Sequence, residues 1–103
     1  LEFRRVLFRS FPRTVLKFKT ADAEGKIIHP TQKPVALCEY LIKTYTNENQ
    51  IILDNCIGSG TTAAACINTN RNFIGIEQEE IYYNKANERI EKHIAEGQQL
   101  KII

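Results

Sequence analysis

The 103-residue sequence lacks a long apolar run, a closely spaced cysteine pair and any excess of glycine or proline. No uninterrupted apolar stretch approaches the roughly 18 residues that a bilayer-crossing helix needs, so the sequence predicts no transmembrane helix. Its three cysteines include no Cys-x-x-Cys pair, which argues against a disulfide framework and against a zinc site. Free thiols fit a reducing compartment, and the predicted location is the cytoplasm.

The composition is that of a small folded domain. Hydrophobic residues make up 43% of the chain and charged residues 25%, with only five glycines and three prolines, which is unlike a disordered segment. A chain of this length has room for one domain with a modest core. Enzymes that hold both a ligand and a substrate are usually longer, so we expect a module or a fragment.

The first twenty residues are strongly basic. The net charge is +2, yet residues 1–20 hold six Arg and Lys against the single acid Glu2. Such a strip can follow a phosphate backbone, although a solvated tail is the commoner explanation of a short charge run. Residues 1–10, LEFRRVLFRS, include no initiator Met and are similar to translated cloning or adapter sequence. We expect residues 1–11 to be a non-native or disordered leader.

Hydrophobic periodicity predicts alternating strands and helices in the remainder, residues 12–103. The residues at 50–54 form a short apolar run, typical of a parallel strand covered on both faces. Asn70 is expected to stop a helix in the left-handed conformation, and Gly97 to end the last one. The predicted elements are a strand at 14–20, a polar turn at 21–26, a helix from Pro34 to Tyr45, a strand at 50–54, a helix at 60–69, a strand at 72–77 and a helix at 79–96.

The strand, helix, strand, helix order predicts a right-handed βαβ unit. The expected fold class is therefore α/β, with a mostly parallel sheet and flanking helices. A ligand should bind outside the carboxyl ends of the strands.

A glycine turn follows the strand at 50–54. Gly58 and Gly60 let a ligand lie against the main chain where a Cβ would collide, and the helix that follows offers unpaired N–H groups. Glu77 ends the next strand about twenty residues later, where a carboxylate can accept both ribose hydroxyls of an adenosine. We therefore expect a ligand that contains a ribose.

Asp54 helps to discriminate between such ligands. The turn has no Lys ahead of its hydroxyl residues, which excludes a phosphate-binding P-loop. A carboxylate just before the turn would repel a pyrophosphate, whereas it favours an ammonium or sulfonium group. A module that binds NAD or another adenosine ligand without methyl transfer remains an alternative. So does a DNA-binding adaptor that depends on the basic strip at 4–19.

Three ordered motifs resemble those of one enzyme family. They are HPTQKP at residues 29–34, DNCIGSGTT at residues 54–62 and FIGIE at residues 73–77. Together they look like the cofactor-binding part of the S-adenosylmethionine-dependent DNA amino-methyltransferases, bacterial and phage enzymes that methylate adenine N6 or cytosine N4. The resemblance covers about residues 12–94 and implies a partial Rossmann-like methyltransferase fold.

The resemblance also implies a set of cofactor-binding residues and assigns none of them to catalysis or to a metal. The glycine turn and the acid before it would line the methionine end of S-adenosylmethionine, the second acid would hold the ribose, and the first motif would reach the methionine carboxylate. A lysine is a compact cation that suits a carboxylate. The predicted residues are Thr31, Lys33, Asp54, Gly58, Ser59, Gly60, Thr61 and Glu77.

The sequence departs from the family pattern in two ways. Asn55 stands where proline is commoner and Cys56 where an aromatic is usual, which predicts weaker stacking on the cofactor. The Pro-Pro-aromatic clamp for the target amine is absent, since Pro12, Pro30 and Pro34 are never adjacent. The resemblance thus implies a C-terminal fragment of a methyltransferase that contacts double-stranded DNA through a missing N-terminal part. Alone, the chain is expected to bind cofactor weakly or not at all, and to transfer no methyl group.

Overall fold

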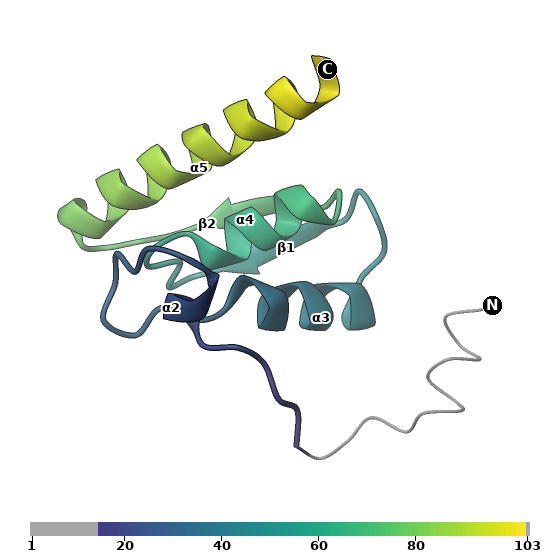
Figure 1. Ribbon diagram of the computed structural model, residues 1–103, viewed down its shortest axis with the longest axis horizontal. Helices are drawn as coiled ribbons and strands as arrows, with labels where there is room; N and C mark the ends of the chain where they lie inside the picture. The colour runs from purple at the N-terminus through teal and green to yellow at the C-terminus, as the bar shows by residue number, and fades with distance from the viewer. Residues whose placement is uncertain (1–14, 103) are drawn as a thin grey trace.

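A computed structural model describes residues 15–102 of the chain, with side chains described up to residue 97 (Figure 1). The predicted leader at residues 1–11 lies outside the described residues. Within them, no helix is long and apolar enough to cross a membrane. The elements are α2 (Ala21–Glu24), α3 (Val35–Tyr45), β1 (Ile51–Asp54), α4 (Thr61–Asn68), β2 (Asn72–Gly75) and α5 (Glu80–Ile102).

The two strands form a parallel pair joined by a crossover helix, as the sequence predicts. Ile51 of β1 is level with Asn72 of β2, and Asp54 is level with Gly75. Both strands therefore end at the same edge, and the loops that follow them leave side by side. Asn70, which has a φ of 60°, ends the helical segment between the strands in the predicted left-handed conformation.

The core lies between the strand pair, α3 and α4. Figure 1 shows α4 in front of the strands, with α3 on one side of it and α5 on the other. Ile42 of α3 packs with Ala65 and Cys66 of α4, and the strands add Ile52 and Phe73. The small side chains of α4 are almost wholly buried, which lets this helix lie close to its neighbours.

The opposite face of the strand pair is uncovered in the described part of the chain. Ile51 and Leu53 are each 65% exposed, and Ile74 is 53% exposed. The prediction that β1 is covered on both faces is therefore wrong for this structure. The reason lies in the alternation of a strand: every second side chain meets the core formed with α3 and α4, while the others point to the opposite face.

The predicted strand at 14–20 is not formed by its described residues, 15–20. A strand needs a neighbour for its main-chain hydrogen bonds, and the strand pair consists of β1 and β2 alone within the described residues. Phe18 instead packs its ring 5.9 Å from that of Tyr40 on α3. The alternation of apolar and polar residues at 15–20 thus belongs to an extended segment that packs against α3 without forming a strand.

Two helix boundaries also differ from the predictions. The expected polar turn at 21–26 contains the short helix α2, which buries Ala21 and ends at Gly25 with a φ of 147°. Gly97 does not end α5, because it does not take up a positive φ and the helix continues to Ile102. A glycine inside a helix costs only about 1 kcal/mol, too little to force a stop.

Candidate functional site

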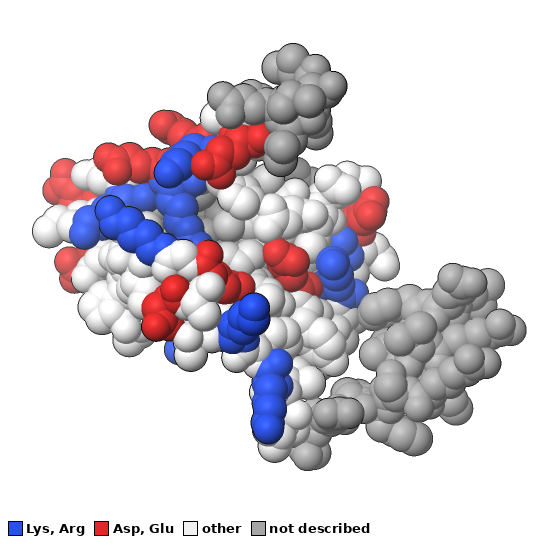
Figure 2. Space-filling view, in the orientation of Figure 1, with Lys and Arg blue, Asp and Glu red and all other residues white. Residues whose placement is uncertain are grey.

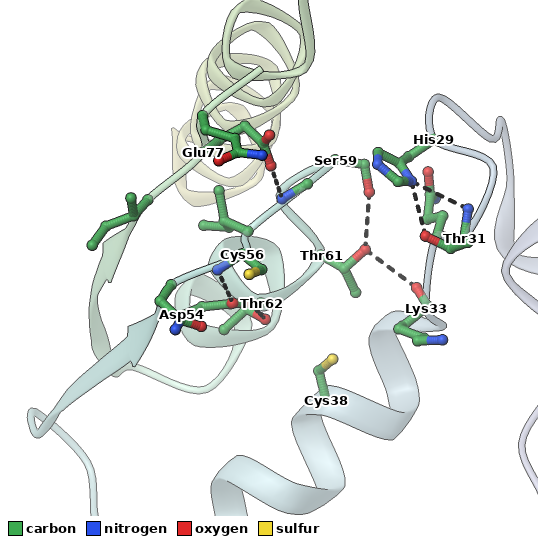
Figure 3. Close-up of a pocket in the computed structure, with 16 residues that line it drawn as sticks. His29, Thr31, Lys33, Cys38, Asp54, Cys56, Ser59, Thr61, Thr62 and Glu77 are labelled. Carbon is green, nitrogen blue, oxygen red and sulfur yellow. Dashed lines mark hydrogen bonds between the residues drawn. The ribbon is translucent and has the colours of Figure 1, made fainter. Parts of the chain in front are cut away.

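A cavity of about 480 Å³ opens at the edge where β1 and β2 end (Figure 3). Its lining comes from three separate stretches of chain, within residues 29–33, 54–62 and 76–78, with Cys38 of α3 added. Apart from Gln78, these stretches belong to the three motifs of the sequence. The fold thus brings together segments that are up to about fifty residues apart.

Seven of the eight predicted site residues line this cavity: Thr31, Lys33, Asp54, Gly58, Ser59, Thr61 and Glu77. Gly60 does not line it. Gly60 has a φ of 86°, and a Cβ there would lie 3.5 Å from the Cβ of Ala86 on α5. Its described contact is therefore with α5 rather than with the cavity. The cofactor-binding roles of all eight remain predictions.

The carboxylate of Asp54 shapes the turn that follows β1. One oxygen, Oδ1, accepts a hydrogen bond from the N–H of Cys56 at 3.0 Å, and Oδ2 accepts one from the hydroxyl of Thr62 at 2.6 Å. The side chain is half-buried at the cavity wall. A carboxylate has about four lone-pair positions, so these two bonds leave it able to meet a cationic group as well.

Glu77 ties the glycine turn to the start of α5. Its Oε1 accepts a hydrogen bond from the N–H of Gly58 at 3.0 Å, and its Oε2 accepts one from the N–H of Glu79 at 2.9 Å. Figure 3 shows the bond from the turn crossing the upper part of the site. Glu77 is thus fixed in position beside the turn, with lone pairs left for ligand hydroxyls.

His29 forms part of the wall rather than a catalytic pair. Its Nδ1 accepts a hydrogen bond from the N–H of Thr31 at 3.1 Å, and its ring centroid lies 4.2 Å from that of Tyr82. Its Cδ2 would be 3.6 Å from a Cβ on Gly58, which has a φ of 56°. The ring therefore packs against the bare main chain of the glycine turn.

A hydrogen bond from a hydroxyl group to a main-chain oxygen connects the glycine turn to the first motif. The hydroxyl of Thr61 donates to the main-chain oxygen of Lys33 at 3.2 Å and lies 3.4 Å from the hydroxyl of Ser59. This contact fixes the main chain at Lys33, 28 residues away in the sequence. Lys33 itself is exposed, so its side chain has room to turn toward a ligand in the cavity.

Sequence reasoning left Cys38 and Arg89 out of the site. Cys38 reaches the cavity from α3, where burial raises the pKa of its thiol, so the group stays neutral near pH 7. Arg89 of α5 donates three hydrogen bonds to Ser59 and Thr61. One signal was present: Ala86, Arg89 and Ile90 share a helical face, and a cation beside two apolar residues is unusual on an inward face.

Figure 2 shows one connected group of blue Lys and Arg side chains at the left of this face, bordered by red Asp and Glu side chains. The other blue side chains of the described residues on this face lie apart from one another. No group of three or more His, Cys, Asp or Glu in the described chain could hold a metal ion. The cavity with its two carboxylates and its lysine is therefore the strongest candidate site in the described region.

Comparison with known protein families identifies the chain. The sequence pattern of the family described as DNA methylase matches residues 8–88, which is most of the chain. The protein belongs to the DNA methylase family. This family carries the N6 and N4 methyltransferase designation, and the match confirms the resemblance drawn from the three motifs.

Individual relatives agree with this assignment. The chain is 40% identical over 74 residues to the type II methyltransferase M.HinfI of Haemophilus influenzae, covering 72% of this chain. The crystal structure of M1.HpyAVI in complex with SAM superimposes with a TM-score of 0.60 at 55% identity over 62% of this chain. TTHA0409 of Thermus thermophilus, complexed with S-adenosyl-L-methionine, gives a TM-score of 0.58 at 29% identity over 60% of this chain.

These likenesses confirm the predicted partial Rossmann-like α/β fold of the methyltransferase type. The chain spans only part of each relative: 21% of the length of M.HinfI, 32% of the M1.HpyAVI chain and 26% of TTHA0409.

Proposed function

We propose that the cavity binds S-adenosylmethionine and that the chain forms the cofactor-binding part of a DNA amino-methyltransferase acting on adenine N6 or cytosine N4. The observation that supports this most directly is the meeting of all three motifs around one cavity, with Asp54 and Glu77 on either side of the glycine turn. Two related structures contain this cofactor, which adds independent support.

The donor set fits each part of the cofactor. The carboxylate of Glu77, already oriented by two main-chain N–H groups, has lone pairs for the ribose hydroxyls. Asp54 supplies negative charge for the ammonium group and the sulfonium field. Thr31 and Lys33 offer a hydroxyl and a mobile cation for the methionine carboxylate. The φ of 56° at Gly58 suits a turn that keeps side chains away from the ligand.

The cofactor supplies a methyl group on a sulfonium, which is already a good leaving group. The tasks left to the polypeptide are therefore to hold the methyl carbon in line with the acceptor nitrogen and to exclude water. The described residues would contribute to the first task, because the hydrogen-bonded glycine turn would position the cofactor, which is one of the two reactants. A base inside duplex DNA must also be flipped out, which costs a few kcal/mol.

We further propose that the grip on the base and on double-stranded DNA is provided by polypeptide beyond residues 1–103. The sequence of the chain holds no Pro-Pro-aromatic string, which the resemblance requires for that grip. On this basis the isolated chain should bind the cofactor weakly and transfer no methyl group to DNA. Methylation of DNA by the purified chain would contradict this part of the proposal.

A nuclear magnetic resonance titration of the isotope-labelled chain tests cofactor binding even when it is weak. S-adenosylmethionine at millimolar concentration should shift the amide signals of Gly58, Ser59 and Glu77, and S-adenosylhomocysteine should act alike. The variant Glu77→Gln should lose these shifts, whereas the neighbouring control Glu79→Gln should keep them. Stronger binding of NAD than of either ligand would favour the non-methylating alternative and sink the proposal.

A further inference from the structure

Arg89 lies on α5, outside all three motifs, yet its guanidinium reaches the glycine turn. The two N–H groups of its Nη1 are shared among three acceptors: the main-chain oxygen of Ser59 at 3.2 Å, the Ser59 hydroxyl at 3.2 Å and the Thr61 hydroxyl at 3.1 Å. The partners are 28 and 30 residues away in the sequence. The contact thus links α5 to the turn through tertiary structure alone.

Two electrostatic effects disfavour a positive charge at this position. Burial lowers the pKa of the Arg89 guanidinium. Thr61 is also the first residue of α4, and the positive end of a helix dipole disfavours a nearby cation. Hydrogen bonds from a charged donor are stronger than neutral ones and offset these costs. The negative charge of Glu24 also raises the pKa of Arg89, so this acid and the three oxygens of the turn together favour the partly buried cation.

Thr61 extends the effect of Arg89 to the first motif. Its hydroxyl accepts from Arg89 and donates to the main-chain oxygen of Lys33 at 3.2 Å, a pairing that uses its single proton once. A continuous path therefore runs from α5 through the glycine turn to Lys33. Figure 3 shows the last part of this path, from Ser59 through Thr61 to Lys33.

We propose that Arg89 is a positioning residue that holds the glycine turn and, through Thr61, the main chain of Lys33 in the geometry required by the amino-acid part of the ligand. The ligand side of this inference rests on the proposed function. The effect on the turn itself does not, and it can be measured without any ligand.

Arg71 provides a matched control within the same fold. It donates from Nε and Nη2 to the hydroxyl and main-chain oxygen of Thr46, at 3.2 and 2.8 Å, and from Nη1 to the main-chain oxygen of Thr69 at 2.7 Å. These partners lie at the other end of α4 from the turn. Arg71→Met and Arg89→Met therefore each remove a guanidinium that contacts three oxygens, at opposite ends of one helix.

Amide hydrogen exchange of the full chain tests the effect on the turn. In Arg89→Met, the amides of Gly58 and Gly60, which donate to Glu77 and to the oxygen of Ile57, should exchange about tenfold faster. In Arg71→Met the exchange rate should increase at the amide of residue 71 and stay unchanged at Gly58 and Gly60. Unchanged exchange at the two glycines, or a uniform rise along the chain, would overturn the proposal.

Two further variants keep the test decisive. Arg89→Lys retains the charge and should restore part of the protection at the turn. If Arg89→Met does not fold, Thr61→Val removes the shared hydroxyl and should expose Gly58 and Gly60 to exchange in the same way. Protection that survives in Thr61→Val would then overturn the proposal.

Ligand selectivity provides a readout that a purely structural role would not change. Arg89→Met should lower the affinity of the chain for S-adenosylhomocysteine by about tenfold. It should lower the affinity for 5′-methylthioadenosine, which lacks the amino-acid part, by less than about threefold. Equal losses for both ligands would overturn the link to Lys33. If the unaltered chain binds neither ligand, the proposed function fails, while the exchange experiment still decides the role of Arg89.

Discussion

The two faces of the strand pair contrast sharply. Ile52 and Phe73 point to α3 and α4 and belong to the core, whereas Ile51, Leu53 and Ile74 on the other face are more than half exposed. The candidate site lies at the strand ends, where loops and helix starts from the covered side meet. The cavity is thus formed on the side of the strand pair that is covered by helices of the same chain.

The first prediction compares two cysteines that differ in solvent exposure. Cys66 is fully buried in the core on the covered face of the strand pair, and burial raises the pKa of its thiol to about 11. A raised pKa keeps the thiol neutral, so at pH 8 only about one molecule in a thousand carries the thiolate. Exposed Cys56 should be alkylated orders of magnitude faster. Mass spectrometry of the labelled chain measures both rates, and equal rates would contradict the packed core.

The second prediction compares adjacent residues of β1. Ile52→Ala should lower the free energy of unfolding by about 2 kcal/mol, because its side chain packs on the covered face. Leu53→Ala should change it by less than about 0.5 kcal/mol, since Leu53 is 65% exposed. Urea denaturation of the two variants gives the difference. A reversed order would show that the bare face is covered in solution.

The third prediction concerns Gly60, where the turn meets α5. Its φ of 86° is poorly tolerated by residues with a Cβ, so Gly60→Ala should cost about 1–2 kcal/mol of stability. The control Gly97→Ala replaces a glycine inside the C-terminal part of α5, where an added Cβ would meet nothing within 4 Å, and should stabilise the chain slightly. Thermal unfolding followed by circular dichroism distinguishes the two, and a stabilised Gly60→Ala would refute the strained turn.

The smallest expected effect tests the hydroxyl of Thr62. Thr62→Val leaves Asp54 without its 2.6 Å hydrogen bond and should destabilise the chain by about 1 kcal/mol. The change would loosen Asp54 without removing its charge, so cofactor affinity should fall less than in Asp54→Asn. Calorimetric titration of both variants compares them. A larger loss in Thr62→Val would mean that the position of Asp54 matters more than its charge.

The sequence predicts the central βαβ unit well because its signals are local. Three segments each determine the type and approximate length of one element: the apolar run before Asp54, the small residues after Gly60 and the second apolar run before Glu77. The strand predicted at 14–20 failed because strand formation depends on a partner that no local pattern reveals.

The candidate site divides in the same way. Asp54 and Glu77 could be placed together because the ends of parallel strands share one edge of a sheet. Arg89 could not be placed, because its contacts with Ser59 and Thr61 depend on how α5 packs across the turn. Motif spacing therefore locates the cavity, and tertiary packing determines what supports it.

The most direct measurement is a crystal structure of the chain grown with S-adenosylhomocysteine. We predict ribose hydroxyls within about 3 Å of the Glu77 carboxylate and the amino-acid part of the ligand between Asp54 and Lys33. Ligand bound at another place on the chain, or in the cavity with its ribose away from Glu77, would contradict it.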